Sequence, residues 1–424
     1  MATLISCVGD TDPIRNFHDG PLLHIARVYR PEKIVLIHSE RSIIKHDAIE
    51  KALQSIDGYD PIIMQDATVI PNQSVFIFDA MFDLLYPIIH AYYQHEDGVL
   101  LNLSSGTPQI ISAIFSINRI SGYNVRAFQV ATPQFASNEG IKHTTGQAIR
   151  ELIATNKDQS TDFQARIIED KGEKFNQVLL MRTFADLIQE YDYEGAYRLL
   201  LKHKLTSKKK RATMIKVLES LLNLVKFQEP LPDVNKSELN EQEKILLNAF
   251  LSIQLQHKRQ LISEVLIRTK NLAEAISEHY LNVKYPNLME YRYEKWYLSK
   301  KTHHDLHVFL DDEAKKARAD TGGNISFDLD SYLSLPIYVN IFRYLEPESV
   351  ILTHLNKVLA INHLRNKVAH GFKPLNQKEV KGQNIYAASQ GLIKEVLDVE
   401  DKWMNYFEII NHDLLQLLGY RDNH

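Results

Sequence analysis

Over about its first 130 residues, the chain alternates between short runs typical of β-strands and longer patterns typical of helices. The runs "KIVLI" and "GVLLNL" are continuously apolar, whereas "PLLHIARVY" and "TPQIISAIFSINRI" repeat their apolar residues at helical spacing. Such alternation predicts parallel strands joined by right-handed crossover helices, because each strand must start from the same end of the sheet. We therefore expect residues 1–155 to form a doubly wound, Rossmann-like α/β domain.

From about residue 160 the sequence becomes helical. The stretches "FNQVLLMRTFADLIQEY" and "RATMIKVLESLLNLVKF" place apolar residues on one helix face. Pro286, in "KYPNLMEYRYEKWY", interrupts the pattern, and a polar, glycine-containing stretch precedes a last set of helices. We expect an all-α connector bundle over 156–290 and an all-α domain over 291–424. The run "KHKLTSKKKR" is typical of a solvated loop.

Composition excludes several classes of protein. Cys7 is the single cysteine of the 424 residues, which excludes an intrachain disulfide and any cysteine-based zinc or iron–sulfur site. A net charge of −4 argues against the basic field of a duplex DNA-binding protein, so we expect no duplex DNA partner. No window has the length of apolar residues that a membrane span needs, and the N-terminus lacks a signal-peptide pattern. We expect a cytoplasmic protein with no membrane partner.

The apolar run "GVLLNL" leads into "SSGTPQ", a turn that opens the next helix. Gly106 permits a tight turn, and Pro108 suits the first helical position because its missing N–H would have no partner there. The N–H groups at that helix end attract a phosphate or another polar group. Ligands of open α/β sheets bind beyond the carboxyl ends of strands, so this turn and "VGDTDP" after the first strand predict a polar pocket. The same features also fit strand-to-helix caps that bind no ligand.

The class of ligand is narrowed by two motifs that are missing. No G-x-G-x-x-G follows the first strand, and no G-x-x-x-x-G-K-[ST] occurs in the sequence. We therefore expect neither a bound dinucleotide cofactor nor a nucleoside triphosphate. What remains is a hydroxyl-rich pocket suited to ribose hydroxyls and adenine edges.

The segment "PESVILTHLNKVLAINHLRNKVAHGFKP" is predicted to be one helix, ended by Gly371 and Pro374. Arg365 and His370 lie in its last turns. Their separation in sequence sets them about 140° apart around the helix and about 7.5 Å apart along its axis. They cannot form a compact pair on one face, so joint action on a substrate requires a distorted helix end or a second copy of the helix. Interaction of both side chains with the helix dipole would explain them without catalysis.

The residues Arg365, Asn366 and His370 form the pattern Arg-Asn-x-x-x-His, which resembles the catalytic motif of HEPN ribonucleases. The all-helical surroundings agree with that family. An N-terminal α/β domain bearing "NLSSGTPQ" after a central strand, and "YDYEGAYRLL" at 191–200 in a helical connector, extend the resemblance. Nearly the whole chain resembles the Csm-type CARF–HEPN ribonucleases of type III CRISPR systems.

This resemblance implies an endoribonuclease that cleaves single-stranded RNA with weak base preference and without a metal cofactor. A histidine titrates near neutral pH and transfers protons, and a guanidinium binds two phosphate oxygens while the ribose 2′-hydroxyl attacks. The resemblance also implies a homodimer. Arg365, Asn366 and His370 of both copies would then build one composite catalytic site, which would resolve the divergence of Arg365 and His370 on one helix.

The implied activator is a cyclic oligoadenylate, made by the type III interference complex and bound by the two CARF domains. The six-adenylate ring is favoured over the four-adenylate ring, although no spacing in the sequence decides between them. Some CARF domains also cleave their activator slowly, and Thr107 is the residue to test for that role. The pocket residues carried over by position are Asp10, Thr11, Asp12, Asn102, Ser104, Ser105, Gly106, Thr107 and Gln109.

Other classes of protein fit the sequence less well. A HEPN toxin paired with a nucleotidyltransferase antitoxin carries a tyrosine where Phe372 stands, and a CARF transcription factor would need a helix-turn-helix that we do not find. A metal hydrolase could use His303, His304, Asp305 and His307 of "THHDLH", although such clusters are more often solvated. The alternative that stays open is a ligand-binding regulatory CARF protein whose HEPN domain only dimerises.

Overall fold

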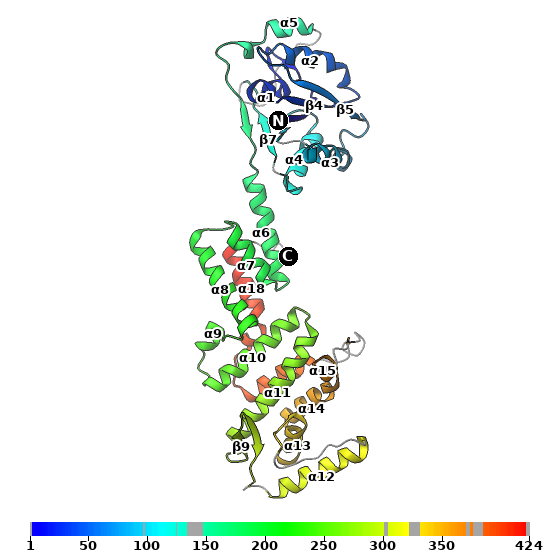
Figure 1. The fold of residues 1–424 in the computed structure, drawn as a ribbon. Coiled ribbons are helices and arrows are strands. Elements are labelled where there is room, and N and C mark those ends of the chain that lie inside the picture. Colours follow the sequence, from blue (N-terminus) through cyan, green and yellow to red (C-terminus); the bar gives the residue numbers. More distant parts are fainter. Residues whose placement is uncertain are drawn as a thin grey trace. The chain divides into compact units, whose positions relative to one another are not determined.

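The computed structural model describes residues 2–95, 98–123, 125–133, 147–300, 304–321, 331–369, 374–375 and 385–420. The chain divides into two compact units, Met1–Asn176 and Gln177–His424, and Figure 1 shows the fold of each. We call the first the α/β unit and the second the helical unit. This order of fold classes is the one that the sequence predicts.

A six-stranded sheet forms the centre of the α/β unit, with the strand order β5-β4-β1-β6-β7-β8. All neighbouring strands are parallel except β7 and β8, which pair antiparallel. Strand β1 is central, and the chain builds the sheet outwards first on one side and then on the other, as in a doubly wound fold. The short β8 was not anticipated from the sequence. The strands are β1 (Thr3–Cys7), β4 (Lys33–Ser39), β5 (Ile62–Ile70), β6 (Val99–Asn102), β7 (Arg126–Val130) and β8 (Ile167–Glu169).

Helices cover both faces of this sheet, α1 and α2 on one face and α3 and α4 on the other (Figure 1). Successive strand residues point to opposite faces, so Leu4 packs in the core under α1 and α2 while Ile5 packs in the core under α3 and α4. The continuously apolar strands are explained by this double coverage. The remaining elements are β2 (Ile14–Arg15), β3 (His18–Asp19), α1 (Pro21–Tyr29), η1 (Ile43–Lys45), α2 (His46–Gln54), α3 (Phe78–His95), α4 (Pro108–Ile120), α5 (Ile149–Ala154), η2 (Lys157–Gln159) and α6 (Glu173–Gln189), which enters the helical unit.

One continuous apolar core runs through the helical unit. The last helix, α18, returns to the beginning of this unit, where Tyr193 Oη donates to Asn411 Oδ1 (2.8 Å) and Asn411 Nδ2 donates to the carbonyl of Ile188 (2.8 Å). The division at about residue 290 therefore stays a prediction. The helices are α7 (Tyr193–Lys202), α8 (Lys208–Phe227), α9 (Pro232–Asn235), α10 (Glu241–Lys258), α11 (Ile262–Lys284), α12 (His304–Thr321), α13 (Leu335–Leu345), α14 (Val350–Ala360), α15 (Asn362–Ala369), α17 (Ile385–Val396), η3 (Asp401–Asn405) and α18 (Tyr406–Leu418).

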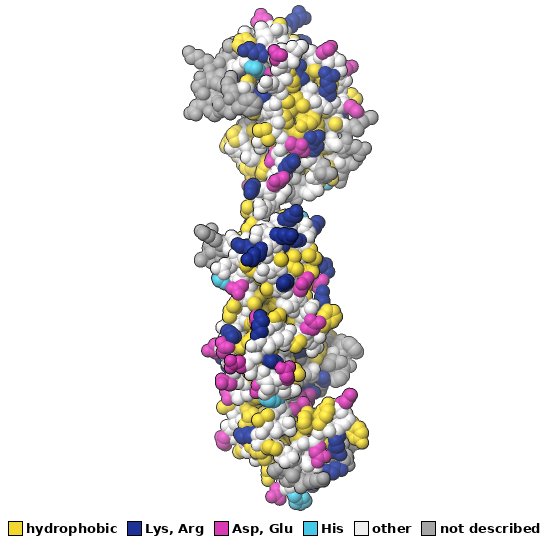
Figure 2. Space-filling view, turned by 90° about the vertical axis from the view of Figure 1, so that its left-hand side faces the viewer, with side chains coloured by type: hydrophobic (Ala, Val, Ile, Leu, Met, Phe, Trp, Pro, Cys, Tyr) yellow, Lys and Arg dark blue, Asp and Glu magenta, His cyan; other side chains and the backbone are white. Residues whose placement is uncertain are grey.

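Two segments of the helical unit differ from the sequence prediction. The break around Pro286 contains a β-hairpin, β9 (Met289–Arg292) and β10 (Lys295–Leu298), where the sequence analysis expected no strands. The basic run from Lys202 to Arg211 is only partly a loop, because α8 already begins at Lys208 and lysine is a good helix former. Figure 2 shows Lys and Arg side chains gathered on the surface of this unit. Among the described helices, none has the length and hydropathy that crossing a membrane requires.

Candidate functional site

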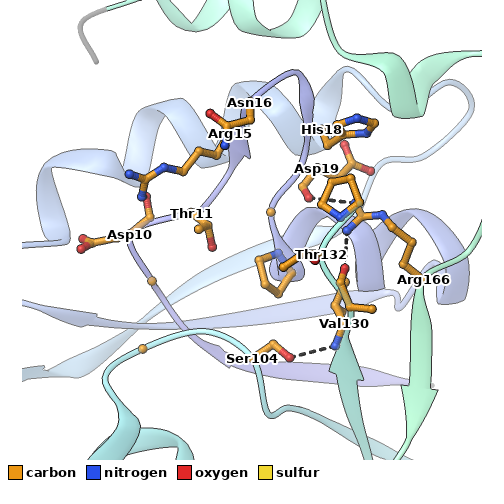
Figure 3. A pocket seen from close by; sticks show the side chains of 16 residues that line it. Asp10, Thr11, Arg15, Asn16, His18, Asp19, Ser104, Val130, Thr132 and Arg166 are labelled. Carbon is orange, nitrogen blue, oxygen red and sulfur yellow. Dashed lines mark hydrogen bonds between the residues drawn. The ribbon is translucent and has the colours of Figure 1, made fainter. Parts of the chain in front are cut away.

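A cavity of about 280 Å³ lies in the α/β unit beyond the carboxyl ends of β1, β6 and β7. Of the predicted pocket residues, Asp10, Thr11, Ser104 and Gly106 line it. Figure 3 shows Asp10 and Thr11 on one side of the cavity, with Ser104 below them. The Ser104 hydroxyl also accepts a hydrogen bond from the Val130 N–H (2.8 Å), which links the ends of β6 and β7. The two turns that the sequence predicted at one sheet edge thus border a single cavity.

Glycines bring the two turns into contact. A Cβ atom on Gly9 would lie 2.9 Å from the backbone nitrogen of Gly106, so a side chain there would push the turns apart. Gly106 itself has φ +117°, and a Cβ atom there would lie 2.8 Å from Ile110 of α4. Both the backbone conformation and the space therefore require glycine at position 106.

Three of the predicted pocket residues are buried beneath the cavity and shape it. Asn102 Nδ2 donates to the hydroxyls of Ser6 and Ser105 (both 2.8 Å), and Asn102 Oδ1 accepts from the Ser104 N–H (2.9 Å). The Asp12 carboxylate accepts from the Gly9 N–H (2.9 Å) and from the N–H of Leu22, at the start of α1 (3.0 Å). These bonds fix the two turns.

Asp12 is buried, and burial raises the pKa of its carboxyl above the ordinary value. Hydrogen bonds from Ser105, Gly9 and Leu22 and the charge of Lys45 lower the pKa in part. The ammonium group of Lys45, at the end of η1, donates to the carbonyls of Gly9 (3.0 Å), Asp10 (2.9 Å) and Asp12 (3.2 Å). The first turn is therefore held both by the Lys45 ammonium, which binds its carbonyls, and by the Asp12 carboxylate, which binds the Gly9 N–H. Sequence reasoning missed Lys45, which gives no local signal.

Thr107 and Gln109 lie at the start of α4 and are not among the residues that line the cavity. The Thr107 hydroxyl accepts from the Ile110 N–H (3.3 Å) as an N-cap and donates to the carbonyl of Val75 (2.7 Å). Gln109 is half-buried. For both residues, contact with a ligand stays a prediction.

The opposite wall of the cavity consists of residues that sequence reasoning did not identify. Figure 3 shows His18, Asp19 and Arg166 there, with Arg15 near Asp10. Arg166 precedes β8 and is buried; it donates to Asp158 Oδ2 (2.8 Å) and to the carbonyls of Asp19 (3.1 Å) and Ala131 (2.6 Å). Its distance in sequence from the two turns explains why no local pattern pointed to it.

Beneath this wall lies a buried network of charges. Arg27 binds both carboxylate oxygens of Asp19 (2.6 and 3.0 Å), and Arg166 pairs with Asp158. The backbone N–H of Arg166 donates to Nε2 of His24 (2.9 Å), and Nδ1 of the same ring lies 3.2 Å from Arg166 Nη2 and 3.7 Å from each of the two carboxylates. Burial alone would raise the pKa of Asp158, but the contacts with His24, His18, the Asp19 N–H and Arg166 together lower it well below its ordinary value.

Asp19, His24 and Asp158 also have the mutual spacing of metal ligands. The two arginines already neutralise both carboxylates, and their positive charges oppose a cation at the same place. We therefore describe this cluster as a structural ion-pair network rather than as a metal site.

The motif predicted to be catalytic begins at Arg365, in the helical unit. The single helix expected there is interrupted at Ile361, which separates α14 from α15. The Ile361 carbonyl accepts from the N–H groups of both Leu364 (3.0 Å) and Arg365 (3.2 Å), and Asn362, a poor helix former, follows the break. Arg365 is half-buried, and its Nη1 donates to Oδ1 of the exposed Asn366 (3.1 Å).

His370, Gly371 and Phe372 lie outside the described residues, as does His303 of the "THHDLH" cluster. His304 and Asp305 are exposed, and Nε2 of His307 donates to the carbonyl of Ser299 (3.0 Å). Among the residues that the structure describes, the group with metal-ligand spacing is in the α/β unit and does not include His304, Asp305 or His307. The catalytic roles of Arg365, Asn366 and His370 stay predictions.

Comparison with known proteins agrees with these two regions. Family models of the Cas_Csm6 CARF domain and the Cas_Csm6 HEPN domain match residues 62–167 and 224–415. Two proteins of Streptococcus thermophilus, the CRISPR system endoribonucleases Csm6 and Csm6′, are each 38% identical to the chain and cover 99% of it over their full length. The solved structure of Enterococcus italicus Csm6 bound to cyclic hexa-2′-fluoro-hexa-dAMP is 25% identical, with a TM-score of 0.69, and covers 98% of this chain and 100% of its own.

Proposed function

Because the chain belongs to the Csm6 family of CRISPR system endoribonucleases, we propose that it cleaves single-stranded RNA when a cyclic oligoadenylate occupies the cavity of its α/β unit. The observation that carries this proposal is the meeting of two polar turns at Gly9 and Gly106, which places hydroxyl, amide and guanidinium groups around one cavity. Such groups match the ribose hydroxyls, adenine edges and phosphates of a nucleotide ring.

The activator is larger than the cavity of one chain. About 280 Å³ is at the lower limit for a ligand of drug size, so a ring of several nucleotides extends beyond it. Two copies related by a two-fold axis would each supply one such cavity to a symmetric ring. The solved Enterococcus italicus relative is bound to cyclic hexa-2′-fluoro-hexa-dAMP, a ring of six nucleotides, which supports a six-adenylate activator over a four-adenylate one. In this proposal the ring comes from the type III interference complex.

The helical units of the same dimer would bring two α15 helices together. In the cleavage step, the ribose 2′-hydroxyl gives its proton to a base and its oxygen attacks the adjacent phosphorus. The bond from phosphorus to the 5′-oxygen breaks, and that oxygen takes a proton, leaving a 2′,3′-cyclic phosphate and a 5′-hydroxyl. His370 is the group proposed to move these protons, and Arg365 is the group proposed to stabilise the negative charge on the phosphate.

Asn366 has a positioning role in this proposal. Its amide oxygen accepts from Arg365, so the amide fixes the direction of the guanidinium that meets the phosphate. No step needs a Lewis acid, because the guanidinium supplies the positive charge; the proposal is therefore a metal-independent nuclease. The proposed substrate and activator would both be met in the cytoplasm, so a cytoplasmic location is part of this proposal.

Ring binding and RNA cleavage are linked, in this proposal, by a coupling free energy between the two sites. The bound ring would favour the dimer arrangement in which the two α15 helices are positioned for RNA cleavage. A slow cleavage of the activator by the α/β unit is a secondary proposal, with Thr107 as the residue to test. Its hydroxyl would first have to leave the carbonyl of Val75.

The test is cleavage of a labelled single-stranded RNA with and without cyclic oligoadenylates, in the presence of EDTA. We expect cleavage that depends on the six-adenylate ring, survives EDTA and disappears in His370→Ala. Ring binding without cleavage at any ring size would overturn the nuclease proposal and would favour a regulatory CARF protein with a dimerising HEPN domain. Cleavage that EDTA abolishes would contradict metal independence.

A further inference from the structure

The corner between α7 and α8 carries a group of lysines that has no role in the proposed cleavage step. Residues 202–211 contain six Lys and Arg residues and no acid, in a chain whose net charge is −4. The two helices pack against each other, and the corner joins the end of α7 at Lys202 to the start of α8 at Lys208 (Figure 1). Its five lysines are all exposed, and we call them the basic corner: Lys202, Lys204, Lys208, Lys209 and Lys210.

The backbone of this corner is fixed by contacts within the helical unit. Arg211, the sixth cation of the run, donates from Nε to the carbonyl of Leu200 (2.8 Å) and from Nη2 to the carbonyl of Leu201 (3.0 Å), at the end of α7. Leu205 is buried in the continuous core of the unit, which extends to α15. The lysines are therefore attached to the same packed unit that carries Arg365.

The charges of the basic corner are not balanced. Among the residues that the structure describes, no carboxylate forms an ion pair with any of its five ammonium groups. At the other end of the same two helices, Arg198 and Lys226 both pair with Glu194 (2.7 and 3.5 Å).

The position of three of these lysines is also unfavourable for the helix. The first turn of α8 consists of Lys208, Lys209 and Lys210 and contains no acid, although the helix dipole favours acids and disfavours cations at that end. Solubility does not explain this choice, because acidic side chains would be solvated as well and would stabilise the helix. The excess of positive charge therefore indicates an anionic partner.

We propose that the basic corner binds the phosphates of single-stranded RNA. This choice of ligand rests on the proposed function. Successive residues of a helix point about 100° apart, so Lys208, Lys209 and Lys210 point in three directions around the start of α8. A flexible strand can bend around the corner and bring a phosphate to each of them, whereas a stiff duplex meets fewer. A protein partner fits less well, because lysine is depleted from protein–protein interfaces.

Binding at the basic corner would affect cleavage through the length of the RNA. Because the corner and α15 belong to one packed unit, a strand held at the corner has a raised effective concentration at the proposed cleavage site. This gain is absent for an RNA too short to reach both places. The basic corner would thus hold the part of a long substrate that lies beyond the cleaved bond, without reading its bases.

The first test measures binding to the full-length protein by fluorescence anisotropy. A labelled 2′-O-methyl RNA of about 16 nucleotides has a length within the range of single-strand sites, and its missing 2′-hydroxyl prevents the proposed cleavage. We expect Lys208→Gln/Lys209→Gln/Lys210→Gln to bind at least about tenfold more weakly at about 0.1 M salt. We also expect its slope of log K against log salt concentration to be smaller by at least about 1.4, or about 0.7 for each of two lost phosphate contacts.

Three controls accompany this variant. Its circular dichroism and melting temperature should not fall below those of the wild type, because removing the lysines relieves repulsion at the start of α8. Replacement of the same three lysines by arginine retains the charge, and we expect wild-type binding. Lys226→Gln/Lys394→Gln/Lys402→Gln removes the same net charge from lysines that pair with acids, and we expect its RNA affinity to stay unchanged.

The second test compares ring-activated cleavage of two RNA lengths, about 4 and about 16 nucleotides. We expect the glutamine variant of the basic corner to lose at least about tenfold in kcat/KM on the longer RNA. Cleavage of the shorter RNA should match the wild type, because the residues of the proposed nuclease site are unchanged. An equal loss on both lengths would contradict the proposed role of the corner.

Unchanged RNA affinity and an unchanged salt slope in the glutamine variant would overturn the proposal. An equal loss of affinity in the variant of Lys226, Lys394 and Lys402 would also overturn it, since net charge alone would then explain binding. Unchanged RNA affinity with a shift of sedimentation from dimer to monomer would assign the corner to contact between two copies instead. Absence of ring-activated cleavage in the wild type would overturn the proposed function, and binding of the uncleavable RNA would still decide this proposal.

Discussion

Two regions of the molecule differ in how firmly one chain fixes their side chains. They are the cavity of the α/β unit and the helix that carries Arg365. Around the cavity, buried groups such as Asn102, Asp12 and Arg166 fix the wall residues through hydrogen bonds that cross from strand to strand. At the other site, Arg365 contacts Asn366, its own neighbour, on a short and half-exposed helix. The wall of the cavity is thus preorganised within one chain, although the proposed ring would extend to a second copy, whereas the residues of the proposed nuclease site would be brought together only by that second copy.

The largest loss of RNA cleavage is expected from a change at the proposed nuclease site. Arg365→Ala removes the proposed charge-stabilising group from both copies at once, so we expect ring-activated RNA cleavage to fall at least about 1000-fold. Affinity for the ring, measured by calorimetry, should stay unchanged because the cavity is in the other unit. The matched control is His363→Ala, an exposed side chain in the first turn of the same helix, which should retain activity. Full activity in Arg365→Ala would contradict the catalytic assignment.

The cavity wall of the α/β unit should lose stability when a buried charge is removed. Asp158→Ala leaves Arg166 without its carboxylate, and breaking a buried ion pair in this way lowers stability by about 3–5 kcal/mol. We expect faster hydrogen exchange in β3, α1 and β8, with little change in the helical unit. Asp162→Ala, an exposed aspartate nearby, is the control. Equal exchange in both variants would show that the network does not stabilise the wall.

Acid should remove part of the same stabilisation. The pKa of Asp158 is lower in the folded protein than the ordinary value of about 3.9, so its contribution is present above that pH and is lost as the pH falls towards the folded value. We expect the difference in melting temperature between the wild type and Asp158→Asn to shrink between pH 6 and pH 3. Asp12, whose pKa is raised, is present in both proteins and cancels in the difference. A difference that is constant over this range would contradict the assignment.

A smaller effect is expected where the turn is held by a cation. Lys45→Met removes the donor to three backbone carbonyls, and hydrogen bonds of a charged group contribute about 1.5–3 kcal/mol. We expect affinity for the ring to fall about tenfold while the rate of cleavage at saturating ring is retained. Lys51→Met, an exposed lysine on α2, has the same change of charge and should bind normally. A normal ring affinity in Lys45→Met would show that the first turn keeps its conformation without the hydrogen bonds of Lys45.

The smallest effect concerns local structure in the helical unit. Asn240 caps α10 by accepting from the Glu243 N–H (3.0 Å), and Glu243 accepts in return from the Asn240 N–H (2.9 Å). We expect Asn240→Ala to destabilise this unit by about 1 kcal/mol, measured by chemical denaturation followed by tryptophan fluorescence. Asn235→Ala, exposed at the end of α9, is the control. A larger loss of stability in Asn240→Ala than in Asp158→Ala would contradict the expectation that the buried charges of the α/β unit contribute more than this helix cap.

Local sequence patterns were sufficient for most of the fold. Strands β4 and β6 and helices α1 and α4 lie where apolar runs and helical periodicity predicted them, because each buries one face or both faces in a core. The patterns missed β8 and the hairpin β9–β10, which are short and depend on neighbours distant in sequence. They also predicted one helix where Ile361 separates α14 from α15, because periodicity continues across a single tightened turn.

Local patterns in the chain were enough to predict the α/β class of the first unit, the two polar turns at one edge of its sheet and the motif at Arg365. The assembled fold was needed to show that Asp12 and Asn102 are buried and hold the two turns, that Lys45 binds the carbonyls of the first turn, and that Arg166 lines the far wall. The physical reason is that periodicity and turn chemistry act between residues close in the chain. The wall of a cavity depends on which buried charges and amides meet after the strands have assembled, and that is set by contacts over long distances in sequence.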